Sequence, residues 1–327
     1  MAEAVLDADL PIIDSHHHLY SSNHWTDGSP YLLPEFAHDL GSGHRIVSTI
    51  YVECGMLQRM SGPDHLRPAG EAAFAAVMAR LAETGHFGPT RACEGFVGHA
   101  DLTSGPLIEE TLVALHDASE GRLRGIRSSA TWDPDPDLAP GARAYAPQGL
   151  MADPAFRAGV KMLADHNLVY DAWQYYPQLS DLGELADAVP DATIVCGHCG
   201  GLVGKRAYSG PENFGHWKAQ IVELAKHPNM SMKIGGLSHD RTGFGYRQRA
   251  ERPTEAELIA DWAPYIETCI EAFGAERCMF ESNFPVDGVA ADYRTLWTVF
   301  KKVAAGCSAD EKAALFAGTA RRIYRLS

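Results

Sequence analysis

The feature of this 327-residue chain that most restricts its fold is a regular alternation of short apolar runs with amphipathic segments. Short apolar runs bounded by turn residues indicate buried strands, and apolar residues three or four apart indicate helices. The strand-like runs cover residues 12–13, 46–54, 92–100, 123–130, 168–173, 193–198, 230–237 and 277–284. The helical patterns cover residues 70–84, 106–118, 153–167, 181–189, 214–227, 254–273, 293–305 and 308–325. Eight such units predict a (β/α)8 TIM barrel rather than an open sheet.

The connections between these segments are of two kinds. Helix-to-strand connections are short, as at residues 227–229 and 274–276. Strand-to-helix connections are long, at residues 19–43, 131–152, 199–213 and 238–253. Long loops on one rim of a barrel are typical of a rim that carries an active site. With no internal repeat and no linker, we expect one domain over residues 1–327.

Composition limits the partners of the chain. A hydrophobic content of 46% and a charged content of 21% are ordinary for a water-soluble globular protein. The net charge of −14 argues against nucleic acid and anionic membranes, which both select basic patches. No apolar run reaches the length of a membrane span, and the acidic first ten residues are unlike a secretory signal. We therefore expect a cytoplasmic protein with a small-molecule substrate, and we leave open whether it forms a homo-oligomer. Its seven cysteines, an odd number, are expected as reduced thiols.

A polar cluster directly follows the first apolar run. In an extended strand alternate residues share a face, so we expect Asp14, His16 and His18 on one face and Ser15 and His17 on the other. Two imidazoles two residues apart can converge on one ion or on one substrate oxygen. Three interpretations are open: a metal site, a metal-free polarising pair, or an exposed run of histidines.

Alternation along the other runs predicts which polar side chains point into the barrel. It places Lys233 inside, and also Tyr51 and Glu53, while Ile194, Cys196 and His198 are expected to share a face. The polar residues expected at the interior or the rim are Tyr51, Glu53, Arg127, Asp171, Trp173, His198, Lys233, Glu281 and Asn283. Polar groups at the carboxyl ends of several parallel strands form the active site of a barrel enzyme.

Four motifs carry a resemblance to a known family. They are Asp-Ser-His-His-His at residues 14–18, Gly-His-Cys-Gly-Gly at 197–201, Phe-Glu-Ser-Asn-Phe-Pro at 280–285 and Gly-Thr-Ala-Arg-Arg-Ile-Tyr at 318–324. In this order the motifs resemble the amidohydrolase superfamily, specifically its amidohydrolase-related (amidohydrolase 2) branch, which contains sugar and pyrone lactonases. The resemblance spans essentially the whole chain. It implies a (β/α)8 barrel that hydrolyses lactone, ester or amide bonds, often with a divalent metal at the top of the barrel.

The resemblance assigns individual positions. His16 and His18 match the first-strand pair that binds metal or substrate, and His198 matches the sixth-strand histidine. Asn283 stands where the family has an aspartate that binds metal and shuttles the proton of the attacking water. A neutral amide cannot accept that proton, so Asn283 is expected to orient a water or to ligate weakly. The fourth strand has Arg127 and no lysine that could be carbamylated, and the fifth has no histidine, so a two-metal site is not expected.

These residues favour hydrolysis of a lactone, or of a related ester or amide, with one divalent metal or none. With a metal, zinc before others, the expected ligands are His16, His18 and His198. Without a metal, the same histidines would polarise the substrate carbonyl. The proton acceptors considered, in order of preference, are Glu53, Asp171, Glu281 and Asp287.

Two basic residues predict the nature of the substrate. Arg127 and Lys233 indicate a carboxylate or another anionic group, since both side chains can pair with one. Asp171, Trp173 and Tyr51 are further candidates for substrate contacts. The long loops are expected to act as lids over the site, with Lys205, Arg206, Tyr208, Arg241, Phe244 and Tyr246.

Three other functions remain open. The same branch also contains metal-dependent, non-oxidative decarboxylases, for which Asn283 is less damaging because no water attacks. Cys196 and Cys199 form a Cys-x-x-Cys motif of the redox type, but positions three apart on an extended strand face opposite ways. Finally, Asn283 motivates a pseudoenzyme that binds a ligand without turnover.

Overall fold

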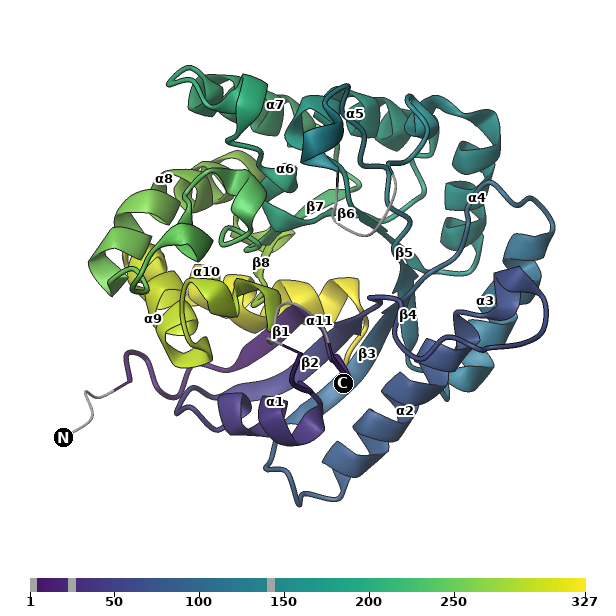
Figure 1. Ribbon diagram of the computed structural model, residues 1–327, viewed down its shortest axis with the longest axis horizontal. Helices are drawn as coiled ribbons and strands as arrows, with labels where there is room; N and C mark the ends of the chain where they lie inside the picture. Colours follow the sequence, from purple (N-terminus) through teal and green to yellow (C-terminus); the bar gives the residue numbers. More distant parts are fainter. Residues whose placement is uncertain (1–4, 23–27, 140–144) are drawn as a thin grey trace.

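The centre of the structure is a closed barrel of eight parallel strands. The computed structural model describes residues 5–22, 28–139 and 145–327. In it each strand pairs in parallel with the next along the chain. The strands are β1 (Ile12–His17), β2 (Ile46–Val52), β3 (Arg91–Gly98), β4 (Leu123–Ile126), β5 (Val169–Ala172), β6 (Ile194–Cys196), β7 (Met230–Ile234) and β8 (Cys278–Phe280). A parallel bridge between His17 and Phe284, which follows β8, brings the two edges of the sheet together, so the predicted (β/α)8 TIM barrel is confirmed (Figure 1).

Helices surround this barrel (Figure 1). They are α1 (Leu33–Leu40), α2 (Ala69–Glu83), α3 (Leu107–Ala118), α4 (Pro154–Asp165), α5 (Leu179–Ala188), α6 (His198–Gly201), α7 (Asn213–Leu224), α8 (Glu255–Phe273), α9 (Tyr293–Val303), α10 (Ala309–Ala313) and α11 (Thr319–Ile323). Two features differ from expectation. The short helix α1 lies inside the segment predicted as a loop, and a π-helical segment, Ala314–Gly318, divides the last predicted helix.

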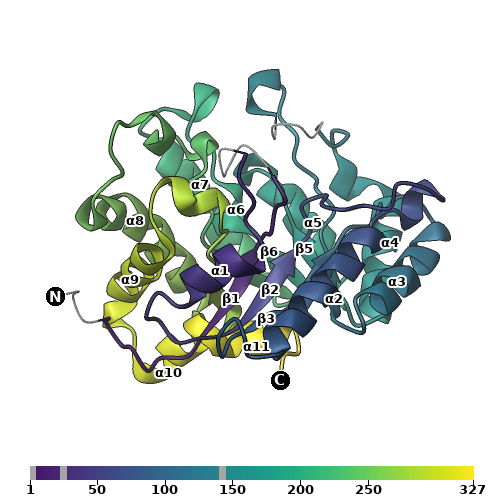
Figure 2. The same cartoon turned by 60° about the horizontal axis from the view of Figure 1, so that its bottom comes forward.

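Two apolar layers stabilise the barrel. The interior is filled mainly by branched side chains from six strands: Ile13, Ile50, Val52, Val97, Val169, Val195 and Met279. The lower end of this interior is filled by residues that follow the strands: Ala317, Ala320, Ile323, Tyr324 and Leu326. Figure 2 shows this C-terminal segment at the end of the barrel opposite the long loops. The outer layer joins the sheet to the helices and includes Trp217, Trp262 and Trp297. Each large apolar side chain contributes about 1.5–3 kcal/mol when fully buried.

The predicted inward orientation of Tyr51 is wrong. Its neighbours Ile50 and Val52 fill the barrel interior, while Tyr51 points outward, where its hydroxyl donates to Glu71 of α2 at 2.9 Å. Tyr51 also stacks on Phe96 with ring centroids 5.8 Å apart. Both faces of a barrel strand are apolar, so alternation between Ile, Tyr and Val does not reveal the side. Tyr51 therefore supports the helix layer.

Two further orientations differ from simple alternation. Asp14 does not share a face with His16, because the pairing of β1 with β2 contains a bulge between Asp14 and His17. Asp14 instead accepts hydrogen bonds from Ser282 Oγ at 2.6 Å and from the Tyr293 hydroxyl at 3.0 Å. Likewise His198 does not share the face of Ile194 and Cys196, which lie in the outer layer, because β6 ends before it.

Among the described residues, no helix has both the length and the apolar content needed to cross a lipid bilayer.

Candidate active site

The first strand delivers two histidines to the end of the barrel. His18 Nδ1 lies 2.8 Å from the carbonyl oxygen of Val52. A carbonyl only accepts, so His18 carries its proton on Nδ1 and leaves Nε2 as a bare acceptor. That Nε2 atom lies 3.1 Å from Nε2 of His16. His17 points to the other side, where its Nε2 lies 2.8 Å from Thr49 Oγ1.

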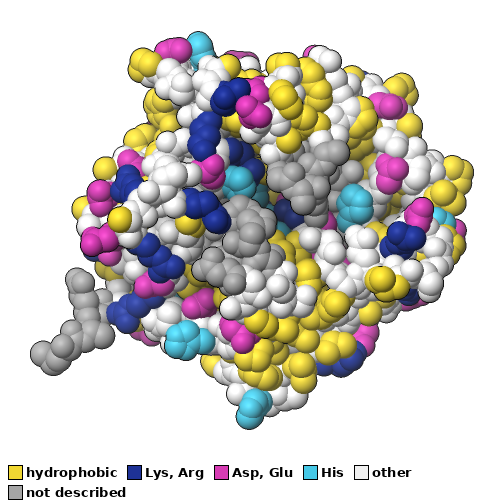
Figure 3. Space-filling model, viewed as in Figure 1, with side chains coloured by type: hydrophobic (Ala, Val, Ile, Leu, Met, Phe, Trp, Pro, Cys, Tyr) yellow, Lys and Arg dark blue, Asp and Glu magenta, His cyan; other side chains and the backbone are white. Residues whose placement is uncertain are grey.

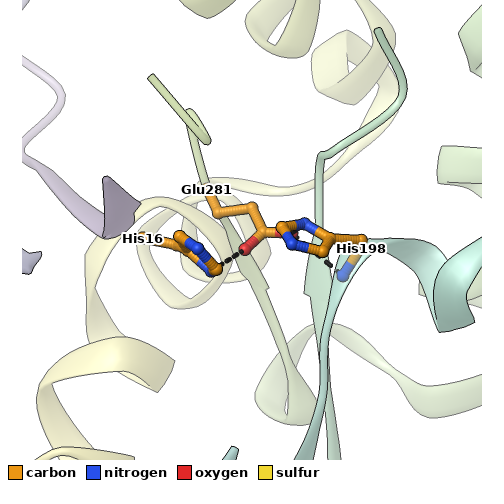
Figure 4. A group of neighbouring side chains, drawn as sticks. All are labelled: His16, His198 and Glu281. Atoms are coloured by element: carbon orange, nitrogen blue, oxygen red, sulfur yellow. Dashed lines mark hydrogen bonds and ion pairs between the residues drawn. The ribbon is translucent and has the colours of Figure 1, made fainter. Parts of the chain in front are cut away.

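The sixth strand delivers His198 through an unusual turn. His198 and Cys199 have φ values of 54° and 49°, a left-handed conformation that few non-glycine residues adopt. The turn is held by Glu281, whose Oε1 accepts from the backbone N–H of His198 at 3.0 Å and lies 2.7 Å from its Nδ1 (Figure 4). Gly236 packs directly against the imidazole, because a Cβ there would lie closer than 3.0 Å to three atoms of His198.

His16 is placed between two acceptors. Its Nδ1 lies 2.9 Å from Glu281 Oε2, and its Nε2 faces the bare Nε2 of His18 at 3.1 Å. Burial first, and then the positive charge of Lys233, lowers the pKa of His16 well below its ordinary value. A neutral imidazole has one N–H and can satisfy only one of these two neighbours. The other contact joins two acceptors, and His16 Nδ1 and Glu281 Oε2 indeed make no hydrogen bond within the described residues.

A cation resolves this conflict. His16, His198 and Glu281 offer ligand atoms that all lie within 4.8 Å of one another (Figure 4). Imidazole nitrogen and carboxylate oxygen are ligands that zinc accepts in catalytic sites, with a position left open for water. The three residues therefore fit a divalent metal. His18, which the sequence analysis included, is not within this group, and Glu281, considered there only as a proton acceptor, is.

The first predicted basic residue, Arg127, already has a carboxylate partner. Its Nε lies 2.9 Å from Glu53 Oε1, and its Nη2 donates to the backbone oxygen of Glu53. Arg127 Nη1 also approaches His16 Nε2 to 3.4 Å. Glu53, the first choice as proton acceptor, is thus held in a buried ion pair.

The second predicted basic residue, Lys233, is also paired. Its Nζ lies 2.7 Å from Asp171 Oδ2, and both side chains are buried inside the barrel. The hydroxyl of Tyr324 donates to the same carboxylate oxygen, and Lys233 Nζ lies 5.0 Å from the centroid of the Tyr324 ring. Alternation predicted the inward direction of Lys233 correctly, but its partners Asp171 and Tyr324 come from distant parts of the chain.

Asn283 is oriented by a buried acid. Its Nδ2 donates to Asp287 Oδ1 at 3.0 Å, which leaves the amide oxygen of Asn283 free to accept a hydrogen bond or to ligate. Burial raises the pKa of Asp287 to about 7, although the hydrogen bond from Asn283 opposes this shift. A carboxyl group with such a pKa can accept a proton near neutral pH. Asp287 comes last among the predicted proton acceptors, because nothing in the sequence shows its burial.

Aromatic and basic side chains form the rim. Trp173 meets His198 edge-on with ring centroids 4.7 Å apart, and the Arg241 guanidinium lies 4.4 Å from the centroid of the Trp173 ring. Figure 3 shows histidine and basic side chains at the centre of this face. Of the other predicted lid residues, Lys205 pairs with Asp240 and Arg206 with Asp135.

The two cysteines of the redox hypothesis lie on either side of His198 in the chain. Cys196 and Cys199 are both free and buried. Burial raises the pKa of the Cys196 thiol, which disfavours the thiolate that redox chemistry requires.

A barrel with histidines and a carboxylate at the carboxyl ends of its strands is the architecture of a metal-assisted hydrolase. The sequence profile described as "Amidohydrolase" matches residues 13–326, so the chain belongs to the amidohydrolase family and is an amidohydrolase-type hydrolase. It is 31% identical to the uncharacterized protein y4mH of Sinorhizobium fredii, over 98% of this chain and all of that one. It is 29% identical to an L-fucono-1,5-lactonase of Burkholderia multivorans, over 83% of this chain and 88% of the relative. An amidohydrolase from Burkholderia multivorans, crystallised with bound zinc, superposes with a TM-score of 0.74 at 25% identity, over 97% of this chain and 99% of that one.

Proposed function

We propose that this hydrolase opens lactones, or related esters or amides, with one divalent cation, zinc before others. The observation that carries the proposal is the acceptor-to-acceptor contact at His16, which a cation would relieve. His16, His198 and Glu281 would hold the ion, with His18 beside them. Such an ion lowers the pKa of a bound water toward neutrality and polarises a carbonyl oxygen.

The surrounding side chains have separate roles in this proposal. The amide oxygen of Asn283 accepts a hydrogen bond from the attacking water and so orients it. Asp287 accepts a hydrogen bond from Asn283 Nδ2 at 3.0 Å and so holds the amide oxygen toward the water, whose proton would pass to solvent because a bound ion would lower the pKa of that water. Arg127 supports His16 from the side through its contact at 3.4 Å. Trp173 provides an apolar wall beside His198.

The relatives support the choice of substrate and metal. The Burkholderia multivorans relative is named for the hydrolysis of a sugar 1,5-lactone, and the similar amidohydrolase structure from that organism contains zinc. Both are compatible with a histidine-rich site at the top of a barrel.

The test joins metal content to turnover. Elemental analysis of the purified protein and a pH-indicator assay on a panel of sugar 1,4- and 1,5-lactones should show about one divalent metal per chain and hydrolysis that a chelator abolishes. His16→Ala should lose both metal and activity, while His216→Ala, an exposed histidine on α7, should keep both. Release of CO2 from carboxylated aromatic acids, with no lactone turnover, would instead support the decarboxylase alternative.

The pseudoenzyme alternative is tested at position 283. If Asn283→Asp raises lactone hydrolysis strongly above an almost inactive wild type, the natural site is degraded. If the substitution lowers an existing activity, the amide is used as proposed.

A further inference from the structure

The basic side chains around the site differ in whether their charge is already balanced. Arg127 is paired with Glu53 at 2.9 Å and Lys233 with Asp171 at 2.7 Å. A buried cation with a carboxylate partner has little left to offer a second anion, because its charge is compensated within the fold. Arg127 and Lys233, which the sequence predicts to bind an anionic substrate, therefore both have carboxylate partners within the protein.

Arg241 is different. It lies in the loop after β7, where its backbone oxygen accepts from the N–H of Gly204 at 2.8 Å, which ties it to the loop after β6. Its guanidinium stacks on Trp173 at 4.4 Å and lies 5.9 Å from the centroid of the Tyr175 ring. Its Nη1 lies 3.3 Å from Nε2 of His239. These contacts fix the position of the cation without neutralising it.

No carboxylate within the described part of the chain forms an ion pair with Arg241 at 4.0 Å or less. Burial lowers the pKa of Arg241 to about 10, which still leaves the guanidinium charged at neutral pH. Of the acids nearby, Asp287 acts on Arg241 from beyond ion-pair distance. A partly buried charge without a partner is costly, unless a ligand supplies the opposite charge.

We propose that Arg241 binds a carboxylate of the substrate, and that the substrate is an anionic lactone rather than a neutral one. This inference rests on the proposed function and specifies its substrate class. A guanidinium stacked on an aromatic face keeps its edge N–H groups available, and these match the two oxygens of a carboxylate.

The spacing of the site supports this assignment. His198 and Arg241 both contact the Trp173 ring, whose centroid lies 4.7 Å from that of the His198 ring and 4.4 Å from the Arg241 guanidinium, so the anion site and the histidines are neighbours around one indole. A lactone of five or six ring atoms with a carboxylate on its side chain can contact two such neighbouring groups at once. The carboxylate would lie against Arg241 while the lactone carbonyl reaches the histidines.

Two substrates that differ in one group test the proposal. Galactaro-1,4-lactone carries a carboxylate where galactono-1,4-lactone carries a primary alcohol. The ratio of kcat/KM for the acid over the alcohol should exceed about tenfold in the wild type, and Arg241→Met should lower this ratio by about 30-fold or more, mainly through KM. Arg241→Lys should give an intermediate ratio, because lysine keeps the charge but not the paired donors.

The matched control is Arg249→Met. Arg249 also stacks on a tyrosine, with its guanidinium 5.1 Å from the Tyr246 ring, but it is exposed and paired with Glu257. Its loss should leave the substrate ratio unchanged. An equal fall of kcat/KM for both lactones in Arg241→Met, or no fall at all, would overturn the proposal.

A binding measurement with a ligand that cannot be hydrolysed tests the anion site independently of lactone hydrolysis. Galactarate, the open dicarboxylate, should bind the wild type in calorimetry, and Arg241→Met should weaken that binding by about 30-fold or more. If neither lactone is hydrolysed but galactarate binds through Arg241, the hydrolase proposal fails and the anion site stands. If the wild type neither binds galactarate nor prefers the acidic lactone, the anion site is overturned. Circular dichroism of each variant excludes misfolding as the cause.

Discussion

A single imidazole, that of His16, links the electrostatics of this site to its chemistry. It lies between Glu281 Oε2 at 2.9 Å and His18 Nε2 at 3.1 Å, and it has one proton for two acceptors. In the absence of an ion, this arrangement is electrostatically unfavourable. A metal ion bound here would therefore remove a repulsion as well as form ligand bonds.

Replacing Glu281 by glutamine tests this account. The amide can donate a hydrogen bond to His16 Nδ1, so it satisfies the contact without a metal. We expect Glu281→Gln to weaken zinc binding by about 10- to 100-fold or more, while the metal-free protein loses little stability. A competitive titration with a chromophoric chelator, and urea unfolding in EDTA, measure the two effects. Glu267→Gln, an exposed acid on α8, is the control. A large loss of stability in metal-free Glu281→Gln would contradict a repulsion between acceptor atoms at His16.

Asp287 should make stability depend on pH. Burial raises its pKa from 3.8 to about 7 in the folded protein, so the folded state binds a proton more tightly than the unfolded chain. The contribution of Asp287 to the free energy of unfolding is fully present below about pH 4, and it is lost as the pH rises through about 7. Asp287→Asn does not titrate, so relative to the wild type it should gain about 2–3 kcal/mol between pH 5 and pH 8. Urea unfolding in EDTA at both pH values measures the free energy of unfolding of the variant and the wild type. If the variant differs from the wild type by the same amount at pH 5 and pH 8, the raised pKa of Asp287 is contradicted.

Residue identity and strand position predicted part of the site. Lys233 lies inside the barrel, as alternation predicted, and His16 and His198 meet Glu281 at the ends of their strands. Two orientations were predicted wrongly. The direction of Tyr51 depends on which apolar face of β2 is inward, and that of Asp14 depends on a bulge in β1. The pairing of Arg127 and Lys233 could not be predicted, since their acids come from other strands.

At the scale of secondary structure, the backbone at the strand ends decides where the side chains point. The left-handed turn at His198 is accommodated because Gly236, at the end of β7, has no side chain. Parallel strands place such loops side by side, so one strand can shape the turn of its neighbour. Alternation within a strand carries no information about these turns.

Gly236→Ala should displace His198. The added Cβ would meet the imidazole closer than 3.0 Å, and the glycine has φ +65°. We expect a loss of about 2–4 kcal/mol in the free energy of unfolding, together with a large loss of zinc affinity. Gly274→Ala is the control, because Gly274 has φ +76° but no atom within 4 Å of its added Cβ. In Gly274→Ala, backbone strain alone should lower the free energy of unfolding by about 1–2 kcal/mol and leave zinc binding intact. Equal effects of both substitutions on zinc affinity would contradict the role of Gly236.

The helices were predicted with uneven success. The sequence Thr-Glu-Ala-Glu at residues 254–257 predicts a capping box at the start of α8, and the structure has it: Thr254 Oγ1 accepts from the Glu257 N–H at 3.3 Å and Glu257 Oε2 accepts from the Thr254 N–H at 2.8 Å. Helix α1 was missed because it is short, although Leu33, Phe36 and Leu40 form a buried face. The π-helical segment Ala314–Gly318 was missed because its sequence reads as an uninterrupted helix.

At the scale of the whole molecule, the barrel interior beneath the site is filled by buried side chains. The buried pair of Lys233 and Asp171 lies inside the barrel, and Tyr324, which follows α11, fills its lower end and donates to Asp171. The alternation of strands and helices predicted the barrel. No local sequence pattern shows that Tyr324 contacts Asp171, a residue of β5 that lies far earlier in the sequence.

Tyr324→Phe should reveal the importance of this contact. The substitution keeps the ring in the interior and removes one hydrogen bond to a buried carboxylate, which costs about 1–3 kcal/mol. Urea unfolding of the variant measures the cost, and Tyr265→Phe, a partly buried tyrosine of α8, serves as the control. A Tyr324→Phe variant as stable as the wild type would contradict a structural role for the hydroxyl.

The position of Tyr324 in the chain has a consequence for synthesis. All eight strands leave the ribosome before residues 314–326, which fill the lower end of the barrel. Until those residues emerge, the nascent barrel exposes its interior apolar side chains and the carboxylate of Asp171 to water. The window for chaperone binding and for misassembly therefore stays open until translation has passed Tyr324.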